Sequence, residues 1–254
     1  MTHRFSGKTA LVTGSTSNIG RSIAQRLAAE GAHVIVSGRN EQRGAAVVEA
    51  IRTNGGRADF VVADLDGSPE VSLALAEQAL ATLGGRLDVL VNNAGIFPAA
   101  NTLTADATMF DQVYGVNVKA PFFLTQALAP QMTAAGGGVI INLGSWVARL
   151  SLPLGALYAS TKAAMETLTR AWSAEFADSG IRVNAVSPGV IRDPALEGPW
   201  AADGLMAGTP AGGSGGPDAI AAAVAYLASD EAEFVHGAVL DVDGGRTGVA
   251  VVAA

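Results

Sequence analysis

Residues 9–20 read TALVTGSTSNIG. The apolar run at 9–13 predicts a buried β-strand, and Ile19, Ile23 and Leu27 follow it at helical spacing. Gly14 suits a tight turn, and Gly20 lets the helix pack close to the strand, so that N–H groups at the helix start face a diphosphate. An ordinary loop between a strand and a helix fits the same letters, because one glycine-rich turn is a weak signal.

The same alternation continues along the chain. Further apolar runs occur at 34–36, 58–63, 87–91, 139–143, 182–186 and near 239–241, and helical patterns occupy the regions near 41–53 and 69–83. Continuous apolar strands joined by amphipathic helices predict a parallel sheet that is covered on both faces. We therefore expect an α/β fold of the Rossmann type, a doubly wound sandwich with a seven-stranded parallel sheet, in a single domain over 1–254.

Residues 193–217 interrupt this rhythm. Prolines at 194, 199, 210 and 217 and a glycine-rich run at 212–216 leave no periodicity. A long irregular segment inside a compact domain is commonly a lid or disordered. We expect a flexible substrate lid at about 193–217.

The composition excludes several classes of protein. The 254 residues are 49% apolar and 15% charged, with a net charge of −7 and no cysteine. Such a chain can form a core and is not disordered. Without cysteine we expect no disulfide, thiol nucleophile or Cys-ligated metal, and we name no metal site. The acidic balance argues against a nucleic-acid partner, and no apolar stretch reaches the ~20 residues of a membrane helix. Without a secretory signal at the start, we expect a cytoplasmic protein whose charge-poor surface favours self-association.

The end of the second predicted strand indicates the cofactor. It reads Ser37-Gly38-Arg39-Asn40 and contains no carboxylate. In a dinucleotide-binding fold, Asp or Glu at this point holds the ribose 2′-hydroxyl of NAD, whereas Arg accommodates the 2′-phosphate of NADP. Arg39 therefore favours NADP(H) over NAD(H), with NAD(H) kept open. The alternative is a solvated arginine at a helix start.

Tyr158 and Lys162 are the candidate acid–base pair. A spacing of four places both side chains on one face of a predicted helix. A phenol has a pKa near 10, and an adjacent ammonium favours the phenolate, so Tyr158 can exchange a proton with an alcohol or carbonyl oxygen. Taken alone, the pair also fits an ordinary helix surface.

The motifs occur in a set order along the chain. They are Thr13-Gly14…Gly20, Asn92-Asn93-Ala94-Gly95, Asn117, Ser145, Tyr158-Ala159-Ser160-Thr161-Lys162 and Pro188-Gly189. From about Gly7 to Gly245, the chain resembles the short-chain dehydrogenase/reductase family in its compact, single-domain, 3-oxoacyl-reductase-like type. Six motifs in the right order make this resemblance highly specific.

The resemblance implies roles for four catalytic residues. Ser145, three residues past Asn142, would hydrogen-bond the substrate oxygen, and Tyr158 would be the catalytic acid/base. Lys162 would bind the nicotinamide ribose and lower the pKa of Tyr158. Asn117 would hold a water that feeds a proton relay to Lys162.

The resemblance also implies the cofactor contacts. Asp64 would contact the adenine, and Ile191 would offer backbone groups to the carboxamide. The full expected set is Gly14, Ser15, Thr16, Ser17, Asn18, Ile19, Gly20, Gly38, Arg39, Asp64, Leu65, Asn92, Ala94, Gly95, Tyr158, Lys162, Pro188, Gly189, Val190 and Ile191.

Three positions depart from the family pattern. Asn18 replaces a glycine, and because Asn tolerates left-handed backbone we expect the loop to survive. Asp193 replaces a threonine that binds the carboxamide, which would place an acid near the cofactor phosphates and weaken binding or alter lid closure. Gly144 replaces a serine, an exchange that we expect to matter little.

Three residues separate Tyr158 from Lys162, whereas six separate the corresponding pair in enoyl reductases that resemble this family. The resemblance therefore implies an NAD(P)-dependent oxidoreductase that acts on a carbonyl or a secondary alcohol. Apolar residues near the expected pocket favour a small apolar substrate, although packing of the lid on itself explains most of them better: Ile96, Phe97, Leu150, Leu152, Leu154, Trp200, Leu205 and Met206.

Two alternatives stay open. One is a 3-oxoacyl-carrier-protein reductase, although 131–138 and 173–180 lack the Lys and Arg that would dock an acidic carrier. The other is a sensor or scaffold that binds NADP(H) without catalysis. The family is typically tetrameric, so we expect a homotetramer whose contacts come from helices near 101–134 and 158–177, with Phe122, Phe123, Leu124, Leu128, Met165, Leu168 and Trp172 as candidates.

Overall fold

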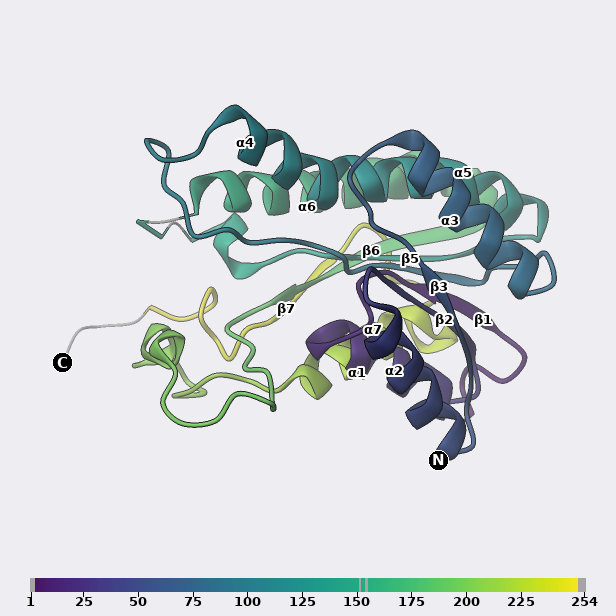
Figure 1. Ribbon diagram of the computed structural model, residues 1–254, viewed down its shortest axis with the longest axis horizontal. Helices are drawn as coiled ribbons and strands as arrows, with labels where there is room; N and C mark the ends of the chain where they lie inside the picture. Colours follow the sequence, from purple (N-terminus) through teal and green to yellow (C-terminus); the bar gives the residue numbers. More distant parts are fainter. Residues whose placement is uncertain (1–2, 151, 154, 251–254) are drawn as a thin grey trace.

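The computed structural model describes residues 3–150, 152–153 and 155–250. A seven-stranded parallel sheet lies at its centre, in the order β3-β2-β1-β4-β5-β6-β7 (Figure 1). The strands are β1 (Thr9–Val12), β2 (His33–Gly38), β3 (Arg57–Val62), β4 (Val89–Asn92), β5 (Gly138–Leu143), β6 (Ile181–Pro188) and β7 (Val239–Val242). The outer bounds of the expected domain, 1 and 254, lie outside the described residues.

Helices cover both faces of the sheet (Figure 1). One face carries α1 (Asn18–Ala29), α2 (Glu41–Thr53) and α7 (Pro217–Ala228), and the other carries α3 (Pro69–Thr82), α5 (Ala120–Ala134) and α6 (Ala156–Glu175). Helix α4 (Ala107–Tyr114) packs against α6. Short 3-10 turns occupy Trp146–Ala148, Ala177–Ser179, Ala201–Met206 and Asp230–Ala232. The predicted doubly wound Rossmann-type fold is confirmed.

The strands are apolar at successive positions because each face has its own core. Val34 and Val36 of β2 belong to the core beneath α1, α2 and α7, whereas Ile35 between them belongs to the core beneath α3, α5 and α6. Successive side chains of a strand point to opposite faces. A strand covered on both sides therefore reads as one continuous apolar run.

The strand order positions the site. The chain builds β1, β2 and β3 toward one edge and then returns to place β4 on the other side of β1. In open α/β sheets, ligands bind in the crevice at the carboxyl ends of the strands where the order reverses. Here that crevice lies between the loops that follow β1 and β4.

The helical region expected near 101–134 is divided. Between α4 and α5, residues Gly115–Lys119 form a π-helical turn. Such turns insert one extra residue into a helix and are frequent at functional sites. The turn contains Asn117, one of the expected catalytic residues.

Several residues expected at subunit contacts are core residues instead. Leu124, Leu128, Met165 and Trp172 are at most 3% exposed and belong to the core beneath α3, α5 and α6. Their spacing on the helices serves packing within the chain. Phe122 differs, since it is 40% exposed.

The segment 193–217 packs on the body of the protein. Met206 joins Trp146 and Val190 in a small apolar cluster. The guanidinium of Arg192 forms an ion pair of 3.0 Å with Asp203 and donates to the carbonyl oxygens of Leu196 and Gly198. The flexibility of this segment stays a prediction.

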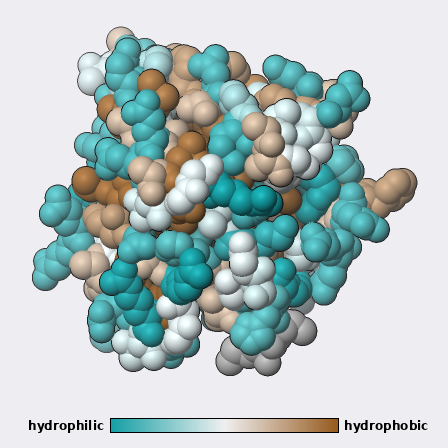
Figure 2. All heavy atoms as spheres, turned by 90° about the vertical axis from the view of Figure 1, so that its right-hand side faces the viewer, coloured by the Kyte–Doolittle hydropathy of each residue, from teal (hydrophilic) through white to brown (hydrophobic). Residues whose placement is uncertain are grey.

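The side of the molecule at the right of Figure 1 shows hydrophilic residues interspersed with small hydrophobic patches (Figure 2). Although the chain has few charged residues, this side of the molecule has no single extended apolar area. Among the described residues, no helix is long and apolar enough to cross a membrane. The same part of the chain holds no group of His, Asp and Glu side chains suited to a metal ion.

Candidate active site

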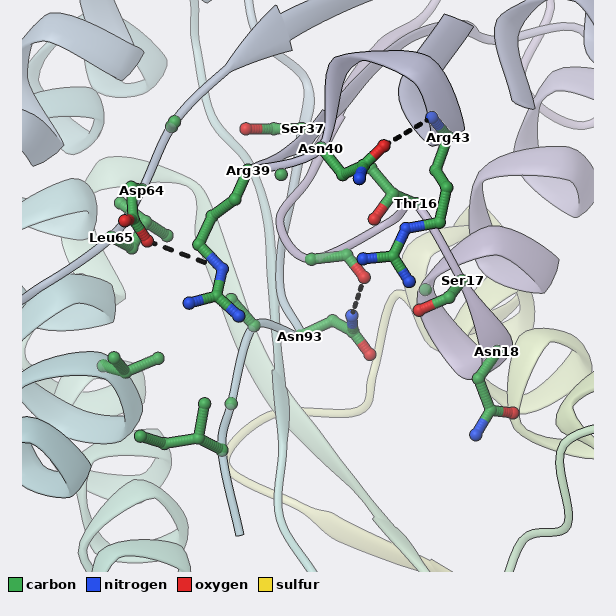
Figure 3. A pocket seen from close by; sticks show the side chains of 18 of the residues that line it. Thr16, Ser17, Asn18, Ser37, Arg39, Asn40, Arg43, Asp64, Leu65 and Asn93 are labelled. Atoms are coloured by element: carbon green, nitrogen blue, oxygen red, sulfur yellow. Dashed lines mark hydrogen bonds and ion pairs between the residues drawn. The ribbon is translucent and has the colours of Figure 1, made fainter. Parts of the chain in front are cut away.

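A cavity of about 410 Å³ opens at the carboxyl ends of β1, β2, β3 and β4 (Figure 3). Many of the expected cofactor residues line it: Gly14, Thr16, Ser17, Asn18, Ile19, Gly20, Gly38, Arg39, Asp64, Leu65, Ala94 and Gly95. The structure therefore brings together segments that are far apart in the chain, such as those of Gly14 and Gly95.

The glycine loop is packed so closely that side chains cannot fit. Gly14 has a φ of +62°, and a Cβ there would lie 2.8 Å from the Cα of Ala94. A Cβ on Gly20 would lie 2.4 Å from the carbonyl oxygen of Gly14. Asn18 has a φ of +42°, so it adopts the left-handed backbone that the sequence led us to expect of it. The loop thus keeps its shape without a glycine at 18.

Two arginines enter the cavity from α2 and the strand before it (Figure 3). The Nε atom of Arg39 lies 3.6 Å from the Oδ1 atom of Asp64, and both side chains are mostly exposed. Arg43 lies one helical turn further on, beside Thr16 and Ser17 in Figure 3. Arg43 is a cavity residue that the sequence did not reveal, because Arg39 lies in the loop between β2 and α2 and no helical spacing relates the two arginines.

Two residues expected to contact the cofactor, Ser15 and Asn92, use their side chains for hydrogen bonds within the protein. The hydroxyl of Ser15 donates to the carbonyl of Val12 at 2.6 Å and accepts the N–H of Ser37 at 2.9 Å, which ties the loop to β2. The amide of Asn92 donates to the Oδ1 atom of Asn142 at 2.9 Å. These side chains brace neighbouring strands and do not line the cavity.

The segment after β6 also lies outside this cavity. A Cβ on Gly189 would lie 2.6 Å from the Cα of Asp243, so the glycine is needed for packing against the backbone after β7. Val190 is buried against Trp146 and Met206. Ile191 forms a bridge to Gly215 at the base of the lid segment. Contacts of 188–191 with a nicotinamide stay a prediction.

Tyr158 and Lys162 lie side by side on α6. The Nζ atom of Lys162 lies 5.6 Å from the centroid of the Tyr158 ring and donates to the carbonyl of Leu143 at 2.9 Å. Ser145, which follows the end of β5, lies near enough to the side chain of Tyr158 to lower its pKa. The expected catalytic groups of β5 and α6 therefore meet.

Burial shifts the two acid–base groups in opposite directions. Desolvation raises the pKa of Tyr158 to about 12, and the side chain of Ser145 opposes this change. Desolvation lowers the pKa of Lys162 to about 8, and the charge of Glu166 opposes that change. The sequence led us to expect a lowered pKa for Tyr158. This is wrong in direction, because desolvation of the phenolate outweighs its neighbours.

Asn117 lies in the π-helical turn, and hydrogen bonds to two other segments fix its side chain. Its side chain accepts the N–H of Ile96 at 2.8 Å and donates to the carbonyl of Ile96 at 3.0 Å and to the hydroxyl of Thr161 at 3.1 Å. It thus ties the loop after β4 to α6, beside Gly95. The water relay expected of Asn117 stays a prediction.

A second, smaller cavity adjoins Tyr158. It measures about 90 Å³ and is lined by Phe97, Val147, Leu152, Gly155, Ala156, Tyr158 and Ala159. The rings of Phe97 and Tyr158 lie 4.7 Å apart between centroids. Leu150, Trp200 and Leu205 pack instead on the cluster around Trp146, and Ile96 lines the larger cavity. Leu154 lies outside the described residues.

Two departures from the family pattern have structural explanations. Asp193 accepts the N–H of Ala195 at 3.0 Å and lies outside the larger cavity, so it stabilises its own loop. A Cβ on Gly144 would lie 2.8 Å from the Oε1 atom at the end of the Glu166 side chain, and the small effect expected of this exchange stays a prediction.

A glycine-rich turn at a helix start, a crevice at the strand reversal and a half-buried tyrosine beside a buried lysine define a nucleotide-binding α/β protein. A family model described as enoyl-(acyl carrier protein) reductase matches residues 14–247. Cyclopentanol dehydrogenase of Comamonas testosteroni is 37% identical over 248 residues, covering 96% of this chain and 98% of the relative.

The chain is also similar to solved structures of reductases and dehydrogenases. One described as a putative betaketoacyl-ACP reductase is 44% identical, with a TM-score of 0.88, and the match covers 96% of this chain and 100% of that one. A short chain dehydrogenase from Burkholderia cenocepacia J2315 in complex with NADP is 35% identical, with a TM-score of 0.89 and coverage of 96% and 99%. This chain belongs to the short-chain dehydrogenase/reductase family, whose members are oxidoreductases that bind nicotinamide cofactors.

Proposed function

We propose that the protein is an NADP(H)-dependent oxidoreductase that interconverts a small apolar ketone and its secondary alcohol, with Tyr158 as the acid/base. The observation that carries this proposal is the meeting of Ser145, Tyr158 and Lys162 beside an apolar cavity of about 90 Å³. Cyclopentanol dehydrogenase, a relative named for a small cyclic alcohol, supports the substrate class.

The larger cavity suits a dinucleotide phosphate. Its floor is a glycine turn without room for side chains, at the start of α1, where backbone N–H groups bind phosphate. Arg39 and Arg43 add two positive charges at the side formed by β2 and α2. Paired guanidinium groups suit a ribose 2′-phosphate, and the relative bound to NADP supports the same choice.

Tyr158, Ser145 and Lys162 have separate roles in the reduction of the carbonyl group. The reduced nicotinamide, when bound, supplies a hydride for the carbonyl carbon. Tyr158, with a pKa of about 12, is protonated at neutral pH and can donate its phenolic proton to the carbonyl oxygen. Ser145 orients that oxygen by a hydrogen bond. Lys162, with a pKa of about 8, carries an ammonium at neutral pH that stabilises the phenolate left behind. In alcohol oxidation the same groups act in reverse.

Two alternative functions have some support. The likeness to a putative betaketoacyl-ACP reductase and the family model's description favour a carrier-bound acyl substrate. The lack of Lys and Arg in 131–138 and 173–180 argues against such a carrier, and three residues between Tyr158 and Lys162 argue for carbonyl rather than enoyl reduction. A binding protein without catalysis would not need Ser145, Tyr158 and Lys162 to lie together.

One experiment separates these functions. We expect NADPH oxidation with small cyclic and linear ketones, loss of this rate in Tyr158→Phe, and unchanged NADPH binding by fluorescence in the variant. An acyl-carrier-protein thioester turned over as fast as the best free ketone would support the carrier-dependent reductase. Tight NADPH binding with no turnover of any substrate would support the sensor.

We also propose that the protein is a cytoplasmic homotetramer. Support comes from an apolar groove on α5 and α6, lined by Val118, Lys119, Phe122, Phe123, Ala164, Thr167 and Leu168. Burial of such a surface stabilises association. Light scattering should report four chains and a smaller assembly for Phe122→Glu; a wild-type monomer would contradict the proposal.

A further inference from the structure

Glu166 is a buried carboxylate that the proposed chemistry does not use. It lies on α6 one turn after Lys162, and its side chain is 7% exposed. Its Oε1 atom is buried and has no hydrogen-bond partner in the part of the chain that the structure describes. Leaving a buried acceptor unsatisfied destabilises the fold, more strongly for a charged group. A site that tolerates this cost has a reason beyond packing.

The surroundings of Glu166 connect it to the catalytic groups. Burial raises the pKa of Glu166 most strongly, and the charge of Arg149 and the backbone at Ser145 lower it. The charge of Glu166 raises the pKa of Lys162 against the effect of burial. A spacing of four places Glu166 on the same face of α6 as Lys162, and its side chain lies against Gly144, the neighbour of Ser145.

Gly144 gives an independent geometric sign of the same arrangement. A Cβ at this position would lie 2.8 Å from the Oε1 atom and 3.2 Å from the Cγ atom of Glu166. The φ of Gly144 is not in the left-handed region. An alanine is thus compatible with the backbone, and the Glu166 side chain would have to shift to admit it. Gly144 and Glu166 form a matched pair beside Ser145.

Charged groups on other elements face the same carboxylate. The Nε atom of Arg149, after the turn that follows Ser145, lies 3.8 Å from the Oε2 atom of Glu166. Arg149 also forms an ion pair with Asp241 of β7 and donates to the hydroxyl of Ser187 at 2.9 Å. The charges of Arg149 and Arg170 lower the pKa of Glu166, and that of Asp241 raises it. Arg149 is shared between two carboxylates, so Glu166 keeps negative charge available for Lys162.

We propose that Glu166 is a positioning residue: its carboxylate holds the backbone at Ser145 and keeps Lys162 as an ammonium, without touching substrate or cofactor. This inference rests on the proposed function, because it concerns the groups that would assist Tyr158. It assigns a reason to Gly144, which makes room for the carboxylate.

The main test is the pH dependence of Glu166→Gln. In the wild type, ketone reduction should decline above about pH 8 as Lys162 loses its proton. Removing the nearby negative charge lowers the pKa of Lys162, so this decline should begin about one pH unit lower in the variant. The exposed Glu175 lies on the same helix, and Glu175→Gln should leave the profile unchanged. A folded Glu166→Gln enzyme with the wild-type profile would overturn the inference.

A second measurement does not depend on turnover. The pH midpoint of NADPH affinity should shift to lower pH in Glu166→Gln, since Lys162 would contact the cofactor. If the wild type binds NADPH but reduces no ketone, the proposed function fails and this shift alone decides the inference. An unshifted midpoint then overturns it.

A thermal-unfolding cycle tests the geometry. Gly144→Ala should lower the melting temperature by several degrees, and adding Glu166→Ala should recover part of the loss because the clash is removed. Additive effects of the two substitutions would contradict the matched pair and, with it, the placement of Glu166 behind Ser145.

Discussion

The two cavities of this protein are built in different ways. The larger one has walls of backbone and glycine, with Gly14 and Gly20 too closely packed for any side chain, and two arginines that provide charge. The smaller one is lined by apolar side chains such as Phe97, Val147 and Leu152. The first is thus fixed by main-chain geometry and suits one constant ligand. The second is fixed by side-chain size, so substitution can change its ligand without changing the fold.

The largest effect should come from Tyr158, which lines only the smaller cavity. Tyr158→Phe should lower kcat by about a hundred- to ten-thousandfold, because it removes the proton donor, and should leave NADPH affinity unchanged. Steady-state rates and a fluorescence titration measure the two quantities. Tyr226→Phe, on a partly exposed tyrosine of α7, is the matched control. A variant that keeps most of the wild-type rate would remove Tyr158 from the chemistry.

Arg39 should show the opposite pattern. Arg39→Ala should weaken NADPH binding by about ten- to a hundredfold, the value of a lost charged hydrogen bond, while NADH affinity and kcat with saturating cofactor change little. Arg43→Ala should act in the same direction, and Arg57→Ala, at the exposed start of β3, should have no effect. Equal losses for NADPH and NADH would show that Arg39 does not recognise the 2′-phosphate.

Asn18 tests the main-chain character of the larger cavity. Asn18→Ala should destabilise the protein by about 1 to 2 kcal/mol, because alanine is less tolerant of a φ of +42°. Asn18→Gly should be close to the wild type. Chemical denaturation measures both variants. A fully stable Asn18→Ala protein would show that the loop relaxes to another conformation.

Phe97 tests the side-chain character of the smaller cavity with the mildest expected effect. It is 58% exposed and lies on the ring of Tyr158. Phe97→Ala should raise the relative kcat/KM for bulkier ketones by roughly three- to tenfold, since it removes apolar surface from one wall. NADPH affinity should stay constant. An unchanged preference across a graded series of cyclic ketones would place the substrate elsewhere.

The sequence predicted the features that depend on local patterns. The seven apolar runs specified a sheet covered on both faces, and the tolerance of Asn18 followed from backbone preferences. The spacing of Tyr158 and Lys162 on one helix face was also sufficient to pair them. The fold and the pairing of Tyr158 with Lys162 can therefore be predicted from residues that are close together in the sequence.

Other features depend on contacts between distant segments. Burial reverses the expected change in the pKa of Tyr158, and Asn92 turns out to bond to Asn142 of the adjacent strand. Gly144 is explained only by Glu166, which lies 22 positions later and on another element. No periodicity in the sequence reports the distance between such groups, so they become visible only once the chain is folded.

The π-helical turn at Gly115–Lys119 has a consequence for helix phase. Each residue of an α-helix advances its side chain by about 100°, so one extra residue lets α4 and α5 present faces to α6 and α3 that a continuous helix could not align. Deleting one residue of this turn would rotate everything beyond it by that angle. The site thus depends on the number of residues between α4 and α5 as much as on their identity. Asn117 lies within the turn that contains the extra residue.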